Sequence, residues 1–110
     1  MTDRELVLNA ARAASIVGEY RTEHQWEEDA GGWTDRTALF YPDDEGWWNP
    51  LDDDGDALRL AVELGLLFSP ALSRAHSELA AGVESDKQEV VRRAIVRAAA
   101  ALAPSAVAVA

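Results

Sequence analysis

Apolar residues near the N-terminus recur every three or four positions, which is the spacing of one face of a helix. They are Leu6, Ala10, Ala13, Ala14 and Val17. The residues from Thr2 to Glu5 precede them and have the form of a capping box, in which a threonine and a glutamate satisfy the first free N–H groups of a helix. The pattern therefore predicts a helix over about residues 3 to 15.

After Gly18 the period of the pattern changes to two, as in a strand with one face in solvent. Tyr20, Thr22, His24 and Trp26 alternate with charged or amide side chains. This alternation predicts a strand, and a longer first helix is the alternative interpretation.

A second strand is predicted over residues 37 to 41, because TALFY is rich in strand-forming residues and can pair with the first strand. The segment between them, Glu27 to Asp35, contains Gly31-Gly32 and is predicted to form a turn or mobile loop.

The sequence DDDGDALRLAVEL predicts a second helix. Its apolar line consists of Ala57, Ala61 and Leu64, with Leu58 and Val62 beside it. We expect this helix to begin within Asp52 to Asp54, to run to about Leu64 and to stop at Gly65. The next three residues, Leu66 to Phe68, are continuously apolar and predict a short buried strand.

Residues 70 to 81 leave two interpretations open. Ser69-Pro70 followed by alanines is typical of a capped helix, which local rules favour, whereas Ser73 to Leu79 can also be read as the alternation of a hairpin strand.

The last helix is predicted from a second capping box, Ser85 to Gln88, to a stop at Pro104. Its expected core stripe is Val91, Ile95, Ala98 and Leu102. The whole pattern predicts one α+β domain over residues 1–104, in which a small antiparallel sheet of three to four strands packs with three or four helices, and a flexible tail over residues 105–110.

The charge of this chain is unevenly distributed along the sequence. The formal net charge is −10, yet residues 19 to 56 hold 13 of the 20 acids and only two arginines, a local net of −11. Such a field repels nucleic acid and anionic membranes and favours encounter with basic partners. We therefore expect no direct nucleic-acid or membrane binding, and we expect these carboxylates to face water as an uncompensated surplus.

Other classes of protein are excluded by what the sequence lacks. The chain has no cysteine, which excludes disulfides, thiolate zinc sites and a cysteine nucleophile. It shows no signal peptide and no apolar run long enough to cross a bilayer, so an intracellular, cytoplasmic protein is expected. No catalytic constellation stands out, and we predict a protein without enzymatic activity or cofactor.

The aspartates at residues 52 to 56 imitate a calcium-binding loop. With Gly55 at the sixth position of such a loop, Pro50 and Ala61 would occupy the first and twelfth ligand positions, so the required acids are missing. Carboxylates before a helix are better explained as caps, which accept free N–H groups at the positive end of the helix dipole. We therefore predict helix capping and no metal site.

Four tryptophans lie within residues 26 to 48, interleaved with carboxylates. Trp48 precedes Asn49-Pro50 and is predicted to be a core residue at a bend. The others are harder to bury together, and they could form an aromatic patch with an acidic rim, a composition typical of protein interfaces.

Smaller signals favour surface roles. His24 and His76 lack metal-ligand spacing and are predicted to lie at or near the surface. For Arg92, Arg93 and Arg97 a solvated surface is favoured, and partnership with the acidic segment is the alternative.

The stretch WNPLDDDGDALRLAVELGL, followed by VVRRAIVRAAAALA, resembles the phage ABA-sandwich domain family and, more loosely, NinX-type accessory proteins of tailed phages. The resemblance covers the first helix and residues 47 to 102. It implies an α+β fold acting in the cytoplasm of a bacterial host and carries no catalytic residues. Residues 27 to 46 have no counterpart in the family pattern, and residues 69 to 83 lack the hairpin that the family places before the last helix.

These observations lead to one favoured function, a phage accessory protein that binds a basic host protein, for example a defence or nucleic-acid-handling factor. The alternative is a small-molecule or nucleotide sponge or sensor, with Trp33, Tyr41 and Trp47 stacking a planar ligand. A hydrolase has the least support. The predicted partner-binding residues are Glu27, Glu28, Asp29, Trp33, Asp43, Asp44, Glu45 and Trp47.

Overall fold

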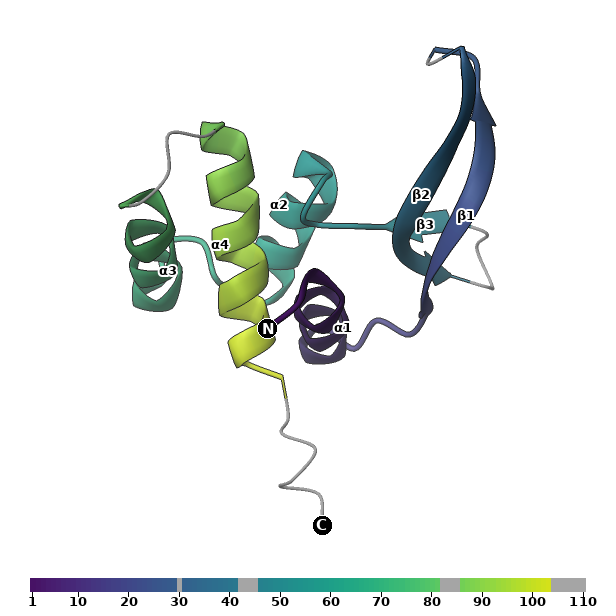
Figure 1. Cartoon of the computed structure of the whole chain (residues 1–110). Coiled ribbons are helices and arrows are strands. Elements are labelled where there is room, and N and C mark those ends of the chain that lie inside the picture. Colours follow the sequence, from purple (N-terminus) through teal and green to yellow (C-terminus); the bar gives the residue numbers. More distant parts are fainter. Residues whose placement is uncertain (30, 42–45, 82–85, 104–110) are drawn as a thin grey trace.

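The fold joins a layer of helices to a small twisted sheet (Figure 1). The structure, a computed structural model, describes residues 1–29, 31–41, 46–81 and 86–103. Its elements are α1 (Asp3–Ala13), β1 (Glu19–Glu27), β2 (Gly32–Tyr41), β3 (Gly46–Trp48), α2 (Asp54–Glu63), α3 (Pro70–Ala80) and α4 (Lys87–Ala101). Three antiparallel strands in the order β1-β2-β3 and four helices confirm the predicted α+β class within the described residues.

Helix α4 is the centre of the helical layer and contacts α1, α2 and α3 (Figure 1). The helix is rich in alanine, whose small side chain lets several neighbours approach its backbone closely. Its buried residues are Val90, Ala94, Ile95, Val96, Ala98, Ala99 and Ala100. Because α4 has three helical neighbours, its buried face is broader than a single stripe.

The predicted core stripes are therefore partly wrong. Val91 and Leu102 of the expected α4 stripe are exposed, as is Val17 after α1. In α2, Leu60 is buried beside Ala57 and Ala61, whereas the expected flanking residues Leu58 and Val62 are exposed. Periodicity locates an apolar face, but the neighbouring helices decide which side of that face turns inward.

Strands β1 and β2 form a long hairpin that confirms the predicted alternation and excludes a longer first helix. They pair from Glu19↔Phe40 to Glu27↔Gly32. The predicted loop over residues 27 to 35 is wrong in extent, because residues 32–35 belong to β2. Gly31 has a φ of 70°, a left-handed conformation that allows the chain to reverse at once and leaves the following residues free to pair.

The connection between α2 and α3 contains no strand, so the buried strand predicted at residues 66–68 is wrong. Gly65 ends α2 as predicted, with a φ of 65°. Leu66 is buried, but Phe68 is fully exposed and has a φ of 67°. A short apolar run becomes a strand only when another strand can pair with it, and here the chain turns directly into α3.

The segment left open by the sequence is a helix, α3. The Ser69 hydroxyl accepts a hydrogen bond from the N–H of Leu72 at 3.1 Å, and Pro70 takes the first helical position. The cap of α4 is Asp86, which accepts from the N–H of Gln88 at 2.9 Å, and not the predicted Ser85. Ser85 and the predicted flexible tail at residues 105–110 lie outside the described residues.

Only the base of the sheet belongs to the core. Leu39 and Trp48, paired across β2 and β3, are almost fully buried in the cluster that α1, α2 and α4 also form, as predicted for Trp48. Tyr20 and Tyr41 pack partly against the same cluster. The rest of the β1–β2 hairpin extends past the helices (Figure 1). Within the described residues, no helix has the length and hydropathy needed to span a membrane.

Candidate functional site

The register of the sheet divides its side chains between two faces, because neighbours along a strand alternate and paired residues share a face. We call the face that carries Leu39 and Trp48 the inner face, since it meets the helices. Beyond the helices it carries three pairs, Thr22↔Thr37, His24↔Asp35 and Trp26↔Trp33. The opposite, outer face carries Arg21, Glu23, Arg36, Phe40 and Trp47.

An aromatic cluster lies at the far end of the inner face. Trp26 and Trp33 meet edge to face, with ring centroids 5.8 Å apart, and His24 stacks on Trp33 at 5.0 Å. The Nδ1 atom of His24 lies 2.8 Å from Oδ1 of Asp35, which fixes the imidazole over the indole. Trp26 and Trp33 are nevertheless 56% and 61% exposed. We name His24, Trp26 and Trp33 the tip cluster; its rings are ordered by one another while their outer surfaces remain open to solvent.

Three carboxylates follow the tip cluster along the chain. Glu27, Glu28 and Asp29 are all exposed, and their side chains have no ion-pair partner among the described residues. These three carboxylates and Trp33 are four members of the predicted set and share the end of the hairpin, but the alternation of β1 places Glu27 on the outer face. The predicted set omitted His24 and Trp26, although the alternation from Tyr20 to Trp26 was the signal that would have placed them beside Trp33.

Trp47, which was predicted to belong with Trp33, lies on the opposite face of the sheet. Its ring contacts Phe40 at a centroid distance of 5.2 Å. The guanidinium of Arg21 lies 3.8 Å above Phe40, and that of Arg36 lies 5.6 Å from Trp47. Arg21 and Arg36 thus lie against this pair of rings, so Trp47 belongs with the outer face of the sheet rather than with the tip cluster.

The predicted stacking site of Trp33, Tyr41 and Trp47 is wrong for the same reason. The strand period places Trp33 and Tyr41 on the inner face and Trp47 on the outer face, so the three rings cannot hold one planar ligand. The predicted partner-binding residues Asp43, Asp44 and Glu45 lie outside the described residues.

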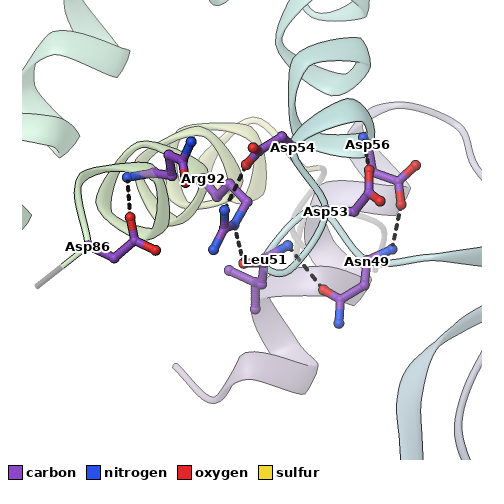
Figure 2. Close-up of polar contacts among 8 residues, drawn as sticks. Asn49, Leu51, Asp53, Asp54, Asp56, Asp86 and Arg92 are labelled. Carbon is purple, nitrogen blue, oxygen red and sulfur yellow. Dashed lines mark hydrogen bonds and ion pairs between the residues drawn. The ribbon is translucent and has the colours of Figure 1, made fainter. Parts of the chain in front are cut away.

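The aspartates before α2 have structural roles, as the capping interpretation predicted (Figure 2). Oδ1 of Asp53 accepts from the N–H of Asp56 at 2.8 Å and caps the helix. Oδ2 of Asp56 accepts from the N–H of Asn49 at 3.0 Å, and the Asn49 side-chain oxygen accepts from the N–H of Leu51. No group of three or more metal-ligating side chains is found in the described part of the chain.

Arg92 of α4 holds the same junction from the other side (Figure 2). Its Nε donates to the carbonyl of Leu51 at 2.8 Å, and a terminal nitrogen donates to Asp54 at 2.7 Å. The hydrogen bond to Asp54 is the largest effect on Arg92 and raises its pKa. Arg93 pairs with Asp3 and Arg97 with Glu78. Arg97 is exposed, as predicted, whereas the side chains of Arg92 and Arg93 are more covered. Of the three, Arg92 pairs with the acidic segment among the described residues, which was the alternative interpretation.

The negative charge of residues 19–56 is thus divided into two parts. Near the helices Asp54 and Asp56 pair with Arg92 and Arg59, and along the hairpin Glu23 pairs with Arg21. The expectation of an entirely uncompensated surplus is wrong for these residues. It holds for the carboxylates at the hairpin tip, within the part of the chain that the structure describes.

Searches against protein-family models, curated proteins and solved structures gave no match for this chain. The resemblance to the phage ABA-sandwich family therefore stays a prediction.

Proposed function

We propose that this chain is a binding protein that engages a basic surface of another protein through the tip of its β1–β2 hairpin. The observation that carries the proposal is the pair of exposed tryptophans, Trp26 and Trp33, at the same end of the hairpin as three exposed carboxylates. Exposed aromatic side chains that are already ordered lose little conformational freedom on binding, which is why tryptophan is frequent among interface anchors.

The charge around the tip favours a partner rich in arginine or lysine. A cationic side chain can lie over an indole face and be neutralised by a neighbouring carboxylate, so Trp33 and Glu28 offer complementary contacts. The position of the tip, beyond the helices, leaves both contacts accessible (Figure 1).

The resemblance to phage accessory proteins extends the proposal to the kind of partner. We propose a basic bacterial host protein in the cytoplasm, for example a defence or nucleic-acid-handling factor, as the target. The acidic tip would then occupy a site that otherwise receives phosphate groups.

Affinity capture from a bacterial lysate tests this proposal. The wild-type chain, Trp33→Ala and Glu28→Lys are immobilised at equal density, and retained proteins are quantified at low and high salt. We expect one or more basic proteins on the wild type, reduced by either substitution and by salt, because screening weakens contacts between exposed charges.

Glu63→Lys is the matched control for Glu28→Lys. Glu63 is an exposed carboxylate on α2, away from the tip, and its reversal changes the net charge by the same amount. Equal retention by Trp33→Ala and the wild type, or equal losses for Glu28→Lys and Glu63→Lys, would contradict binding at the tip.

A further inference from the structure

Strand β2 has a free edge next to the end of β3. Strand β3 pairs only with residues 39–41 of β2, whereas β2 begins at Gly32. On this side, residues 32–38 therefore have no neighbouring strand within the described part of the chain. An unpaired edge presents backbone N–H and C=O groups that another extended chain can use.

One side-chain hydrogen bond shows which backbone groups face this edge. The Asn49 amide, directly after β3, donates to the carbonyl of Thr37 at 3.2 Å. The backbone groups of Thr37 therefore point toward the β3 side, and by the alternation of a strand those of Trp33 and Asp35 do so as well. The side-chain amide of Asn49 thus pairs with β2 where the backbone of a further β3 residue would otherwise do so. From Asp35 toward the hairpin tip, this edge of β2 has no paired strand among the described residues.

The open edge lies beside a hollow of about 480 Å³. On the side of the sheet it is lined by residues 35–38 of β2, by Glu27 of β1, and by Trp47 and Asn49. The other wall is the start of α2, with Asp52, Asp53, Asp56 and Arg59. A strand that continued the line of β3 toward the hairpin tip would run along this hollow.

The lining of the hollow is acidic on balance, because it has five carboxylates against the two guanidinium groups of Arg36 and Arg59. Asp35 and Asp52 lie near the open edge, and Asp52 is held there because the Asn49 amide that donates to Thr37 also donates to its carboxylate at 3.1 Å. Trp47 forms an apolar part on the outer face. An added strand would therefore present alternate side chains to carboxylates on one face and to an indole on the other.

We propose that an extended basic peptide segment binds here by adding a strand to the free edge of β2. Its backbone pairs with Trp33 and Asp35, and its side chains alternate between basic residues facing Asp35 and Asp52 and apolar residues facing Trp47. This inference rests on the proposed function, because it specifies how a basic partner docks on the same hairpin.

Charge decides between this occupant and a second copy of the chain. Two copies carry −10 each and would bring acidic walls together, which charge repulsion opposes. The edge of β1 is also unpaired in the sheet order of the described residues, but the acidic hollow lies beside β2, so specificity is expected at β2.

The probe is a synthetic peptide of alternating lysine and valine, KVKVKVK, with blocked ends. Its isomer KKKKVVV has the same composition and charge but cannot place lysine and valine on opposite faces of a strand. We expect the alternating peptide to bind about tenfold more tightly than the block isomer, measured by calorimetry, because only the alternating peptide can present lysines to the carboxylates and valines to the indole at the same time.

Backbone pairing is tested by N-methylation. Only alternate N–H groups of an added strand face β2, so methylating either all valines or all lysines should weaken binding about tenfold, and methylating the other set should leave it unchanged. Amide hydrogen exchange shows which strand edge the peptide binds. Bound peptide should protect the N–H groups of Trp33 and Asp35 but not those of Thr22 and His24, which face the β1 edge.

Several outcomes would overturn strand addition. They are equal binding of the two isomers, equal effects of the two methylation patterns, and protection at β1 instead of β2. Protection of Trp33 and Asp35 in a peptide-free dimer, seen by sedimentation, would identify a second copy as the occupant. The proposed function is tested separately by the lysate capture. If the alternating peptide does not bind but Trp33→Ala still retains fewer lysate proteins than the wild type, strand addition is contradicted and binding at the tip is not.

Discussion

At the scale of single residues, the junction between β3 and α2 depends on a few short polar side chains. Asn49 donates to the carbonyl of Thr37 and accepts from the N–H of Leu51, so it ends the strand and begins the turn. Asp53 then caps α2, and Arg92 ties the turn to α4. Of the four aspartates that resemble a metal loop, two thus accept hydrogen bonds from backbone N–H groups and two accept them from side chains.

We predict that Asp53→Ala lowers the free energy of unfolding by about 1 kcal/mol, because it removes the side chain that accepts the N–H of Asp56. Asparagine can accept the same hydrogen bond, so Asp53→Asn should retain most of the stability. Urea unfolding followed by circular dichroism measures both. Equal stability of Asp53→Ala and wild type, or equal losses in the two variants, would show that capping is not the role of Asp53.

At the scale of secondary-structure elements, the hairpin and the α2–α3 connection differ in how well the sequence describes them. The hairpin follows its alternating pattern along its whole length, and a glycine at its turn allows the reversal. The connection does not follow its apolar pattern, since Phe68 is exposed and adopts a left-handed backbone conformation. Such a conformation is unfavourable for a bulky side chain.

We predict that Phe68→Asn raises the free energy of unfolding by about 0.5–1 kcal/mol, because asparagine tolerates a positive φ and the exposed ring contributes no packing. Leu67→Asn is the control. Leu67 lies next to Phe68 but is only partly exposed and has no positive φ, so asparagine there should give no gain. A lower stability of Phe68→Asn than of wild type in urea unfolding would contradict this account.

At the scale of the whole molecule, the helices hold most of the core and the sheet is attached to them at its base. Leu39 and Trp48 belong to the helical core cluster, whereas Trp26 and Trp33 lie beyond it. The core and the proposed binding surface are thereby separated in space. The tip can present an apolar surface to a partner without taking that surface from the core.

Two matched truncations test this separation. Trp48→Ala should lower the free energy of unfolding by about 3–5 kcal/mol, because it removes a large buried side chain. Trp33→Ala should lower it by about 1 kcal/mol or less, the contribution expected of an exposed aromatic pair. Both are measured by urea unfolding with far-ultraviolet circular dichroism. Similar losses for the two variants would mean that the tip is part of the core.

The candidate site was predictable in part. The sequence identified Glu27, Glu28, Asp29 and Trp33 as accessible, because charge and aromatic side chains accumulate there beyond what a core can use. It placed Trp47 with them, although only the strand register decides which face an aromatic side chain occupies. The free edge of β2 could not be predicted from side chains, because it consists of backbone N–H and C=O groups. It is free because β3 is short and pairs only with residues 39–41 of β2.

By itself the sequence determined the order and type of α1, β1, β2, α2 and α4, because amphipathic periods, caps and glycine stops act locally and a few neighbouring residues suffice to specify them. It did not predict β3, and it left α3 open. It also determined that the acids concentrate in the segment from β1 to the start of α2. The tertiary structure alone decided which flank of each helix is buried, which carboxylates meet arginines from α4, and which strand edge remains open. Those outcomes depend on contacts between residues far apart in the chain, and no local pattern contains them.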